Sequence, residues 1–162
     1  MAGHPRGKGE HDTERPAGTG KRWGMARKRV LIVDDEAESR TLLREFLGTG
    51  YDICEAADGT EGLARAEQFR PDVILLDVRM PGLDGYEVCQ GLKENPEIKP
   101  IPVIMVTAVE DTTLNRLAFQ AGAAACLVKP VRNETLLALI AAVLAEGERR
   151  EHPKDKSDED EA

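Results

Sequence analysis

The chain has 162 residues and a formal net charge of −8 at pH 7, which allows one domain with a full hydrophobic core and little beyond it. Residues 30–145 carry ten Lys or Arg against nineteen Asp or Glu, a balance that argues against direct nucleic-acid binding, because phosphates require a basic face. No apolar run is long enough for a membrane span and the N-terminal residues lack the charged-then-apolar layout of a signal peptide, so we expect a cytoplasmic protein without a membrane partner.

The first half of the chain begins with a predicted basic, disordered tail at residues 1–27 and continues as two strand–helix units. A buried strand at 30–33 is followed by a helix that closes near Gly48. A weaker edge strand at 51–57 is followed by a helix that Asp58 caps and that ends near residue 69. The side chains expected to face inward from these two helices are Leu42, Leu43, Phe46, Leu47, Leu63 and Ala66.

The second half is predicted to alternate in the same way. Further strands are expected at residues 73–76, 103–106 and 124–128. Helices are expected at residues 85–94 and 111–121, and a last helix is expected to be capped by Asn133. Their inward stripes comprise Val88, Leu92, Leu114, Leu117, Ala118, Leu136, Leu137, Ile140, Val143 and Leu144. Residues 147–162 turn polar and acidic, and we expect a second disordered tail there.

Five strands alternating with five helices predict a doubly wound α/β fold, because parallel neighbouring strands need helical crossover connections. The nearly continuous apolar strands agree with a parallel sheet that is covered on both faces. In open sheets of this kind, ligands bind outside the carboxyl ends of the strands. We therefore expect function to reside at that edge.

Cysteine and histidine offer little chemistry for this domain. The three cysteines, Cys54, Cys89 and Cys126, are odd in number, far apart and set among apolar residues. They predict buried thiols, with neither a disulfide framework nor a cysteine metal site. All three histidines lie in the terminal segments, so we expect no histidine chemistry within the domain.

Four of the predicted strands end in chemically matched polar residues. Asp34 and Asp35 follow the first strand, Asp77 ends the third, Thr107 the fourth and Lys129 the fifth. Three neighbouring carboxylates repel one another unless a cation offsets them, and Mg²⁺ suits an all-oxygen set that meets a phosphoryl group. Lys129 and Thr107 can serve further phosphoryl oxygens, which leaves Asp77 as the best nucleophile. Singly, each residue could be a helix cap, a strand residue or a surface charge; jointly they favour one site.

Together these residues closely resemble the receiver domain of bacterial response regulators over residues 28–146. The motifs that carry the resemblance are Asp34-Asp35, Asp77 within LLDVRMPGLDGYE, Thr107-Ala108 and Lys129-Pro130. The resemblance implies a flavodoxin-like five-stranded parallel sheet of order 2-1-3-4-5. It also implies that Asp77 accepts a phosphoryl group from a sensor histidine kinase or a phosphotransfer protein.

The resemblance implies roles for individual residues as well. Asp35, Asp77 and the backbone carbonyl of Arg79 would bind Mg²⁺ directly, while Asp34 would act mainly through water. The Lys129-Pro130 peptide bond would be cis. The protein would not be an enzyme with turnover, since it would catalyse transfer only to its own Asp77. Cys126 stands where the family usually has an aromatic switch residue, which puts the usual switch in doubt.

We expect a stand-alone receiver that switches a protein-interaction surface in a phosphorelay. Two other functions remain open from the residues alone. A haloacid-dehalogenase-like phosphatase also uses Asp, Thr, Lys and Mg²⁺, but it places its nucleophile in a D-x-D pattern that VLIVDDE lacks. A pseudo-receiver would bind a partner without phosphorylation, and the complete acidic set argues against it.

Overall fold

The computed structural model describes residues 26–108 and 112–151. Both predicted tails lie largely outside these residues, as do all three histidines and the predicted start of the helix at residue 111. None of the helices in the described part combines the length and the hydropathy that a membrane crossing requires.

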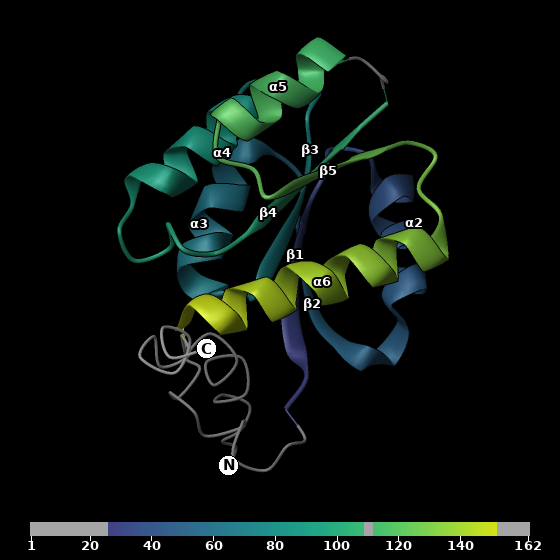
Figure 1. Ribbon diagram of the computed structural model, residues 1–162. Coiled ribbons are helices and arrows are strands. Elements are labelled where there is room, and N and C mark those ends of the chain that lie inside the picture. The colour runs from purple at the N-terminus through teal and green to yellow at the C-terminus, as the bar shows by residue number, and fades with distance from the viewer. Residues whose placement is uncertain (1–25, 109–111, 152–162) are drawn as a thin grey trace, which may run out of the picture.

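The described residues form five strands and five α-helices that alternate along the chain, as predicted (Figure 1). The strands are β1 (Lys28–Val33), β2 (Tyr51–Ala56), β3 (Val73–Asp77), β4 (Val103–Thr107) and β5 (Ala125–Val128). The helices are α2 (Ala37–Leu47), α3 (Gly59–Phe69), α4 (Gly85–Glu94), α5 (Thr112–Gln120) and α6 (Asn133–Glu151), with a 3-10 turn, η2 (Gly48–Gly50), after α2.

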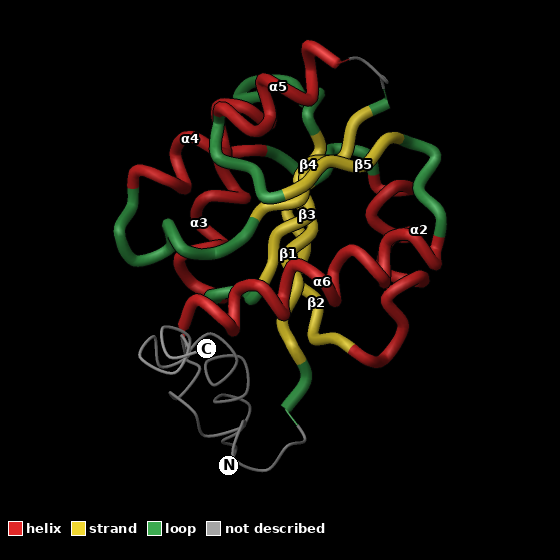
Figure 2. Tube along the Cα trace, in the orientation of Figure 1, coloured by secondary structure: helices red, strands yellow, loops and turns green. Residues whose placement is uncertain are grey.

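All five strands are parallel and lie in the order β2-β1-β3-β4-β5, which confirms the predicted topology. The sheet runs through the middle of the molecule, with helices on both sides (Figure 2). The helices α2 to α5 each carry the chain back to start the next parallel strand, so all strands end at the same edge. The order changes direction between β1 and β3, and their carboxyl ends therefore flank the expected ligand crevice.

Two hydrophobic cores hold the layers together, one on each face of the sheet. Successive residues of a strand point to opposite faces, so Leu31 and Val33 join one core while Val30 and Ile32 join the other. Helices α3, α4 and α5 pack on the first face and α2 and α6 on the second. The central strand β3 is buried along its whole length, as its apolar run predicted.

Some predicted inward side chains are exposed. Leu42 of α2 is 44% exposed and Leu117 of α5 is 40% exposed. Leu43 and Leu47 form the buried stripe of α2, and Leu42 lies one position, or about 100°, away from it. On α5 the small residue Ala118 faces the sheet in place of Leu117.

The start of α3 agrees with its prediction, whereas both ends of α6 differ from theirs. Asp58 caps α3 as expected, since its side chain accepts a hydrogen bond from the Glu61 N–H at 2.8 Å. The last helix begins at Asn133 itself, where the carbonyl of Arg132 accepts from the Leu136 N–H at 2.9 Å. The cap is therefore one residue earlier than predicted. Helix α6 also continues to Glu151, beyond its expected end near Glu146.

The thiols are less buried than predicted. Cys89, on α4, is fully buried, whereas Cys54 on β2 and Cys126 on β5 are only half-buried. Both strands lie at an edge of the sheet, where fewer neighbours cover them. The three thiols are unpaired within the described residues, in line with the expectation of no disulfide.

Candidate functional site

The carboxyl edge of the sheet gathers the acidic residues that the sequence singled out. One carboxylate oxygen from each of Asp34, Asp35 and Asp77 lies within 4.8 Å of the others. Asp34 is 2% exposed and Asp77 is 7% exposed, whereas Asp35 is exposed. The fold brings them together because β1 and β3 are neighbours in register, with Val33 opposite Leu76.

Lys129 supplies the positive charge of this acidic cluster. Its Nζ lies 3.5 Å from Asp34 Oδ2 and 3.6 Å from Asp77 Oδ1. The Lys129-Pro130 peptide bond is cis, as the resemblance implied, and the Lys129 N–H donates to the carbonyl of Thr107 at 2.6 Å. The end of β5 is thereby tied to the end of β4 beside the acids.

The electrostatics of Asp77 reflect burial among like charges. Its pKa is raised from 3.8 to about 6, first by burial and then by the charge of Asp34, although Lys129 acts to lower it. Burial alone would lower the pKa of Lys129, but the charges of Asp34 and Asp77 raise it instead. The site therefore holds more negative charge than one lysine neutralises, and a cation would fit it.

The loop between β3 and α4 is held close to the acidic cluster. Val78 donates its N–H to the carbonyl of Val106 at 3.1 Å and accepts from the Gly85 N–H at 2.8 Å. A Cβ at Gly85 would lie 2.5 Å from the carbonyl oxygen of Asp77, so only glycine allows this approach. Arg79 is exposed in this loop, two residues after Asp77.

Thr107 is 1% exposed at the end of β4. Its two neighbouring strands are β3, which ends in Asp77, and β5, which leads into Lys129. The five polar residues predicted at strand ends thus lie at the ends of adjacent strands. The three acids lie close to one another, and Lys129 pairs with Asp34 and Asp77.

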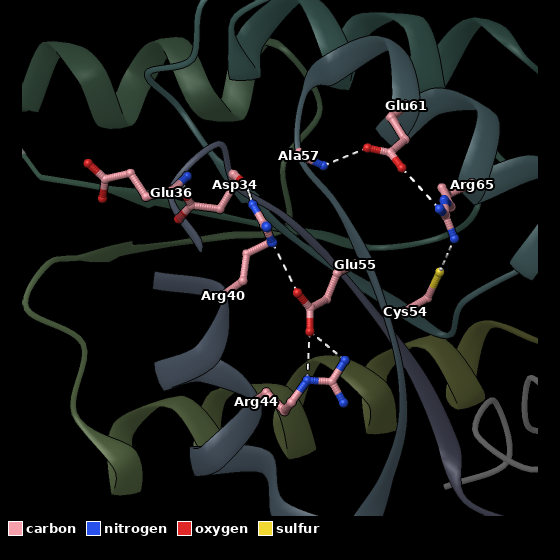
Figure 3. A network of polar contacts seen from close by, with 9 residues as sticks. All are labelled: Asp34, Glu36, Arg40, Arg44, Cys54, Glu55, Ala57, Glu61 and Arg65. Carbon is pink, nitrogen blue, oxygen red and sulfur yellow. Dashed lines mark hydrogen bonds and ion pairs between the residues drawn. The ribbon is translucent and has the colours of Figure 1, made fainter. Parts of the chain in front are cut away.

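A polar network on the β2 side of the site escaped sequence analysis (Figure 3). Arg40 Nη1 donates to the backbone carbonyl of Asp34 at 2.7 Å, and Arg40 Nε donates to Glu55 Oε1 at 3.0 Å. Arg44 Nε donates to Glu55 Oε2 at 2.6 Å. Burial alone would raise the pKa of Glu55, but the hydrogen bonds from Arg44 and Arg40 outweigh it and lower that pKa. The only sequence signal was the spacing of two arginines one helical turn apart.

The fold and the site are those of a flavodoxin-like signalling module, and comparisons with known proteins identify the family. A family model for the response regulator receiver domain matches residues 30–141. Protein PilH from Pseudomonas aeruginosa is 42% identical over 118 residues, which cover 72% of this chain and 98% of PilH. The structure of the chemotaxis protein CheY4 from Vibrio cholerae has 36% identity and a TM-score of 0.70, covering 73% of this chain and 99% of that one.

Other relatives are longer. The probable transcriptional regulator ycf27 from Porphyridium aerugineum is 39% identical over 121 residues, which cover 74% of this chain but 49% of that protein. The chain spans 26% of the response regulator PleD from Caulobacter vibrioides. This chain belongs to the response regulator receiver domain family, whose members act in two-component signalling through a phosphoacceptor.

Proposed function

We propose that Asp77 is the phosphoacceptor of this receiver and that its phosphorylation requires Mg²⁺. The observation that carries the proposal is the meeting of three carboxylates and one lysine at the carboxyl edge of the sheet. Asp77 lies centrally in it, because it shares Lys129 with Asp34 and belongs to the middle strand. Family membership supports the same assignment.

The donor set fits Mg²⁺, which prefers oxygen ligands and keeps several waters. Asp35, Asp77 and the backbone carbonyl of Arg79 would hold the ion directly, and Asp34 would act mainly through water. When bound, the ion offsets the charge of the acids and of the incoming phosphoryl group. The raised pKa of Asp77, which burial and Asp34 cause, supports the need for such a cation.

The chain's own residues supply the remaining chemistry of the transfer. A carboxylate oxygen of Asp77 attacks phosphorus, and the bond between phosphorus and the donor's imidazole nitrogen breaks as the imidazole leaves. Lys129 pairs with one phosphoryl oxygen and the Thr107 hydroxyl donates to another. The protein catalyses this step only on itself, and so it is a substrate of its own reaction rather than an enzyme with turnover.

The partners follow from this chemistry. The phosphoryl donor is a sensor histidine kinase or a phosphotransfer protein. The domain that accepts the phosphoryl group comprises residues 28–146 together with the rest of α6. We propose that it acts as a cytoplasmic receiver whose output is a protein contact. Direct DNA binding is not expected of a domain with nineteen acidic and ten basic residues over 30–145.

The proposal is tested by incubating the protein with a small acyl-phosphate donor and Mg²⁺ and measuring its intact mass. One phosphoryl group should be added to the wild type and none to Asp77→Ala. Chelating Mg²⁺ should stop the addition, because the uncompensated carboxylates repel the donor. Full labelling of Asp77→Ala, or full-rate labelling in chelator, would refute the acceptor or the metal role respectively.

A further inference from the structure

We propose that Arg40 is a positioning residue for the Asp35 carboxylate, an inference that rests on the proposed metal-binding function. Arg40 reaches from α2 to the loop after β1, where its Nη1 donates to the Asp34 carbonyl at 2.7 Å (Figure 3). That carbonyl belongs to the peptide unit joining Asp34 to Asp35. Holding it limits rotation of this planar unit and therefore the direction in which the Asp35 side chain leaves the backbone.

The position of the Asp35 carboxylate depends on its backbone more than that of the Asp34 carboxylate does. The carboxylate of Asp34 accepts from the Glu36 N–H at 2.9 Å and lies 3.5 Å from Lys129 Nζ. Within the described ranges 26–108 and 112–151, the Asp35 carboxylate makes no hydrogen bond or ion pair. Its place in the acidic cluster is consequently set by the peptide that Arg40 holds.

Arg40 is itself held firmly. Its side chain is 18% exposed, and its Nε donates to Glu55 Oε1 at 3.0 Å. Glu55 belongs to β2 and stands in register with Ile32 of β1. The Asp34 N–H donates to the carbonyl of Ala56 at 3.1 Å, so β2 fixes the same loop a second time. The Arg40 guanidinium thus links the edge strand β2 to the loop after β1. Its planar shape fixes the geometry of its hydrogen bonds to Glu55 and to the Asp34 carbonyl.

Arg44 offers a matched control. It lies one turn away on α2 and also pairs with Glu55, but within the described residues it makes no contact with the Asp34 carbonyl. Arg40→Met and Arg44→Met each remove one positive charge and leave Glu55 with one arginine. By charge alone, either change strengthens Mg²⁺ binding to the nearby acids. Loss of the hydrogen bond that positions Asp35 weakens Mg²⁺ binding instead. The direction of the change in Mg²⁺ affinity therefore separates the effect of charge from the effect of positioning.

The experiment measures Mg²⁺ affinity by calorimetry for the wild type and both variants. Arg40→Met should bind Mg²⁺ about threefold to tenfold more weakly than Arg44→Met, the change that one lost hydrogen bond corresponds to. If Arg40→Met bound Mg²⁺ as tightly as Arg44→Met, or more tightly, the inference would be overturned. Matching thermal unfolding curves for the two variants exclude a general loss of structure.

A second measurement, amide hydrogen exchange followed by NMR, requires no metal. The Glu36 N–H, which donates to Asp34 Oδ1, should exchange faster in Arg40→Met than in Arg44→Met, because the loop is no longer held. Unchanged exchange would contradict the positioning role. Wild-type protein that binds no Mg²⁺ would refute the proposed metal site instead, and exchange at Glu36 would then decide the role of Arg40.

Discussion

At the scale of single residues, the site is governed by the charge of Asp77. Its carboxylate is buried beside Asp34, and Lys129 is the one cation that pairs with these two acids among the residues that the structure describes. Folding therefore makes ionisation of Asp77 harder, which is why its pKa rises from 3.8 to about 6. A folded-state pKa above the unfolded value means that the folded protein binds more protons between these two values, and stability is lost as the pH rises through that window.

Replacement of Asp77 by Asn should remove this loss of stability. With Mg²⁺ chelated, Asp77→Asn should melt at a higher temperature than the wild type at about pH 8, where Asp77 is charged. At about pH 4.5 the wild-type carboxyl is largely protonated, and the difference should shrink. Circular dichroism melting curves at both pH values measure it. A difference that is constant with pH would show that ionisation of Asp77 costs the folded state nothing.

Residue-level prediction from sequence succeeded for strand ends and failed for contacts between elements. Asp34, Asp77 and Lys129 each follow an apolar run directly, so the parallel topology alone brings them to one edge. The contact of Arg40 with Glu55 depends on the register of β2 against β1 and on the rotation of α2. Neither quantity can be obtained from the local pattern around these residues.

At the scale of elements, the junction between β3 and α4 controls the shape of the site. Asp84 caps α4 in a capping box with Glu87, so the helix starts at a defined residue. Gly85 then lies against the backbone of Asp77 and Val78, close enough that an added Cβ would meet both. The Pro-Gly turn after Asp77 was evident from sequence, whereas this close approach required the packed helix.

Substitution of Gly85 by Ala should lower the free energy of unfolding by about 1 to 3 kcal/mol, the typical cost of overpacking. The obstacle is backbone, which cannot move aside as a flexible side chain can. Gly147→Ala is the matched control, because nothing lies within 4 Å of its added Cβ in α6. There alanine should stabilise the helix by about 0.5 to 1 kcal/mol. Urea unfolding curves compare them, and equal effects would contradict the packing described for Gly85.

The sequence predicted the positions of the helices better than it predicted which of their side chains are buried. Hydrophobic periodicity located every α-helix within the described residues, yet it also placed Leu42 and Leu117 inside, where the structure leaves them exposed. The apolar stripe predicted for a helix is wider than the strip of helix surface that packs against the sheet. The spacing between helix and sheet decides which leucine of the stripe is covered. Small residues such as Ala118 fill the closest approaches instead.

At the scale of the whole molecule, one topology accounts for the convergence of distant residues. Asp34 and Lys129 are 95 positions apart, yet their side chains lie 3.5 Å from each other because every strand of the sheet ends at the same edge. The order β2-β1-β3-β4-β5 places β3 in the middle, so Asp77 lies between the acids of β1 and the residues of β4 and β5. The alternation of strands and helices predicted a parallel sheet covered on both faces, and the resemblance to receiver domains implied its strand order.

The most direct measurement is the identity of the residue that carries the phosphoryl group. After treatment with an acyl-phosphate donor and Mg²⁺, borohydride reduces an aspartyl phosphate to homoserine, and peptide mass spectrometry locates that change in the chain. We predict homoserine at position 77 and at no other aspartate. Homoserine at position 34 or 35 with an unmodified Asp77 would contradict the assignment of Asp77 as the acceptor.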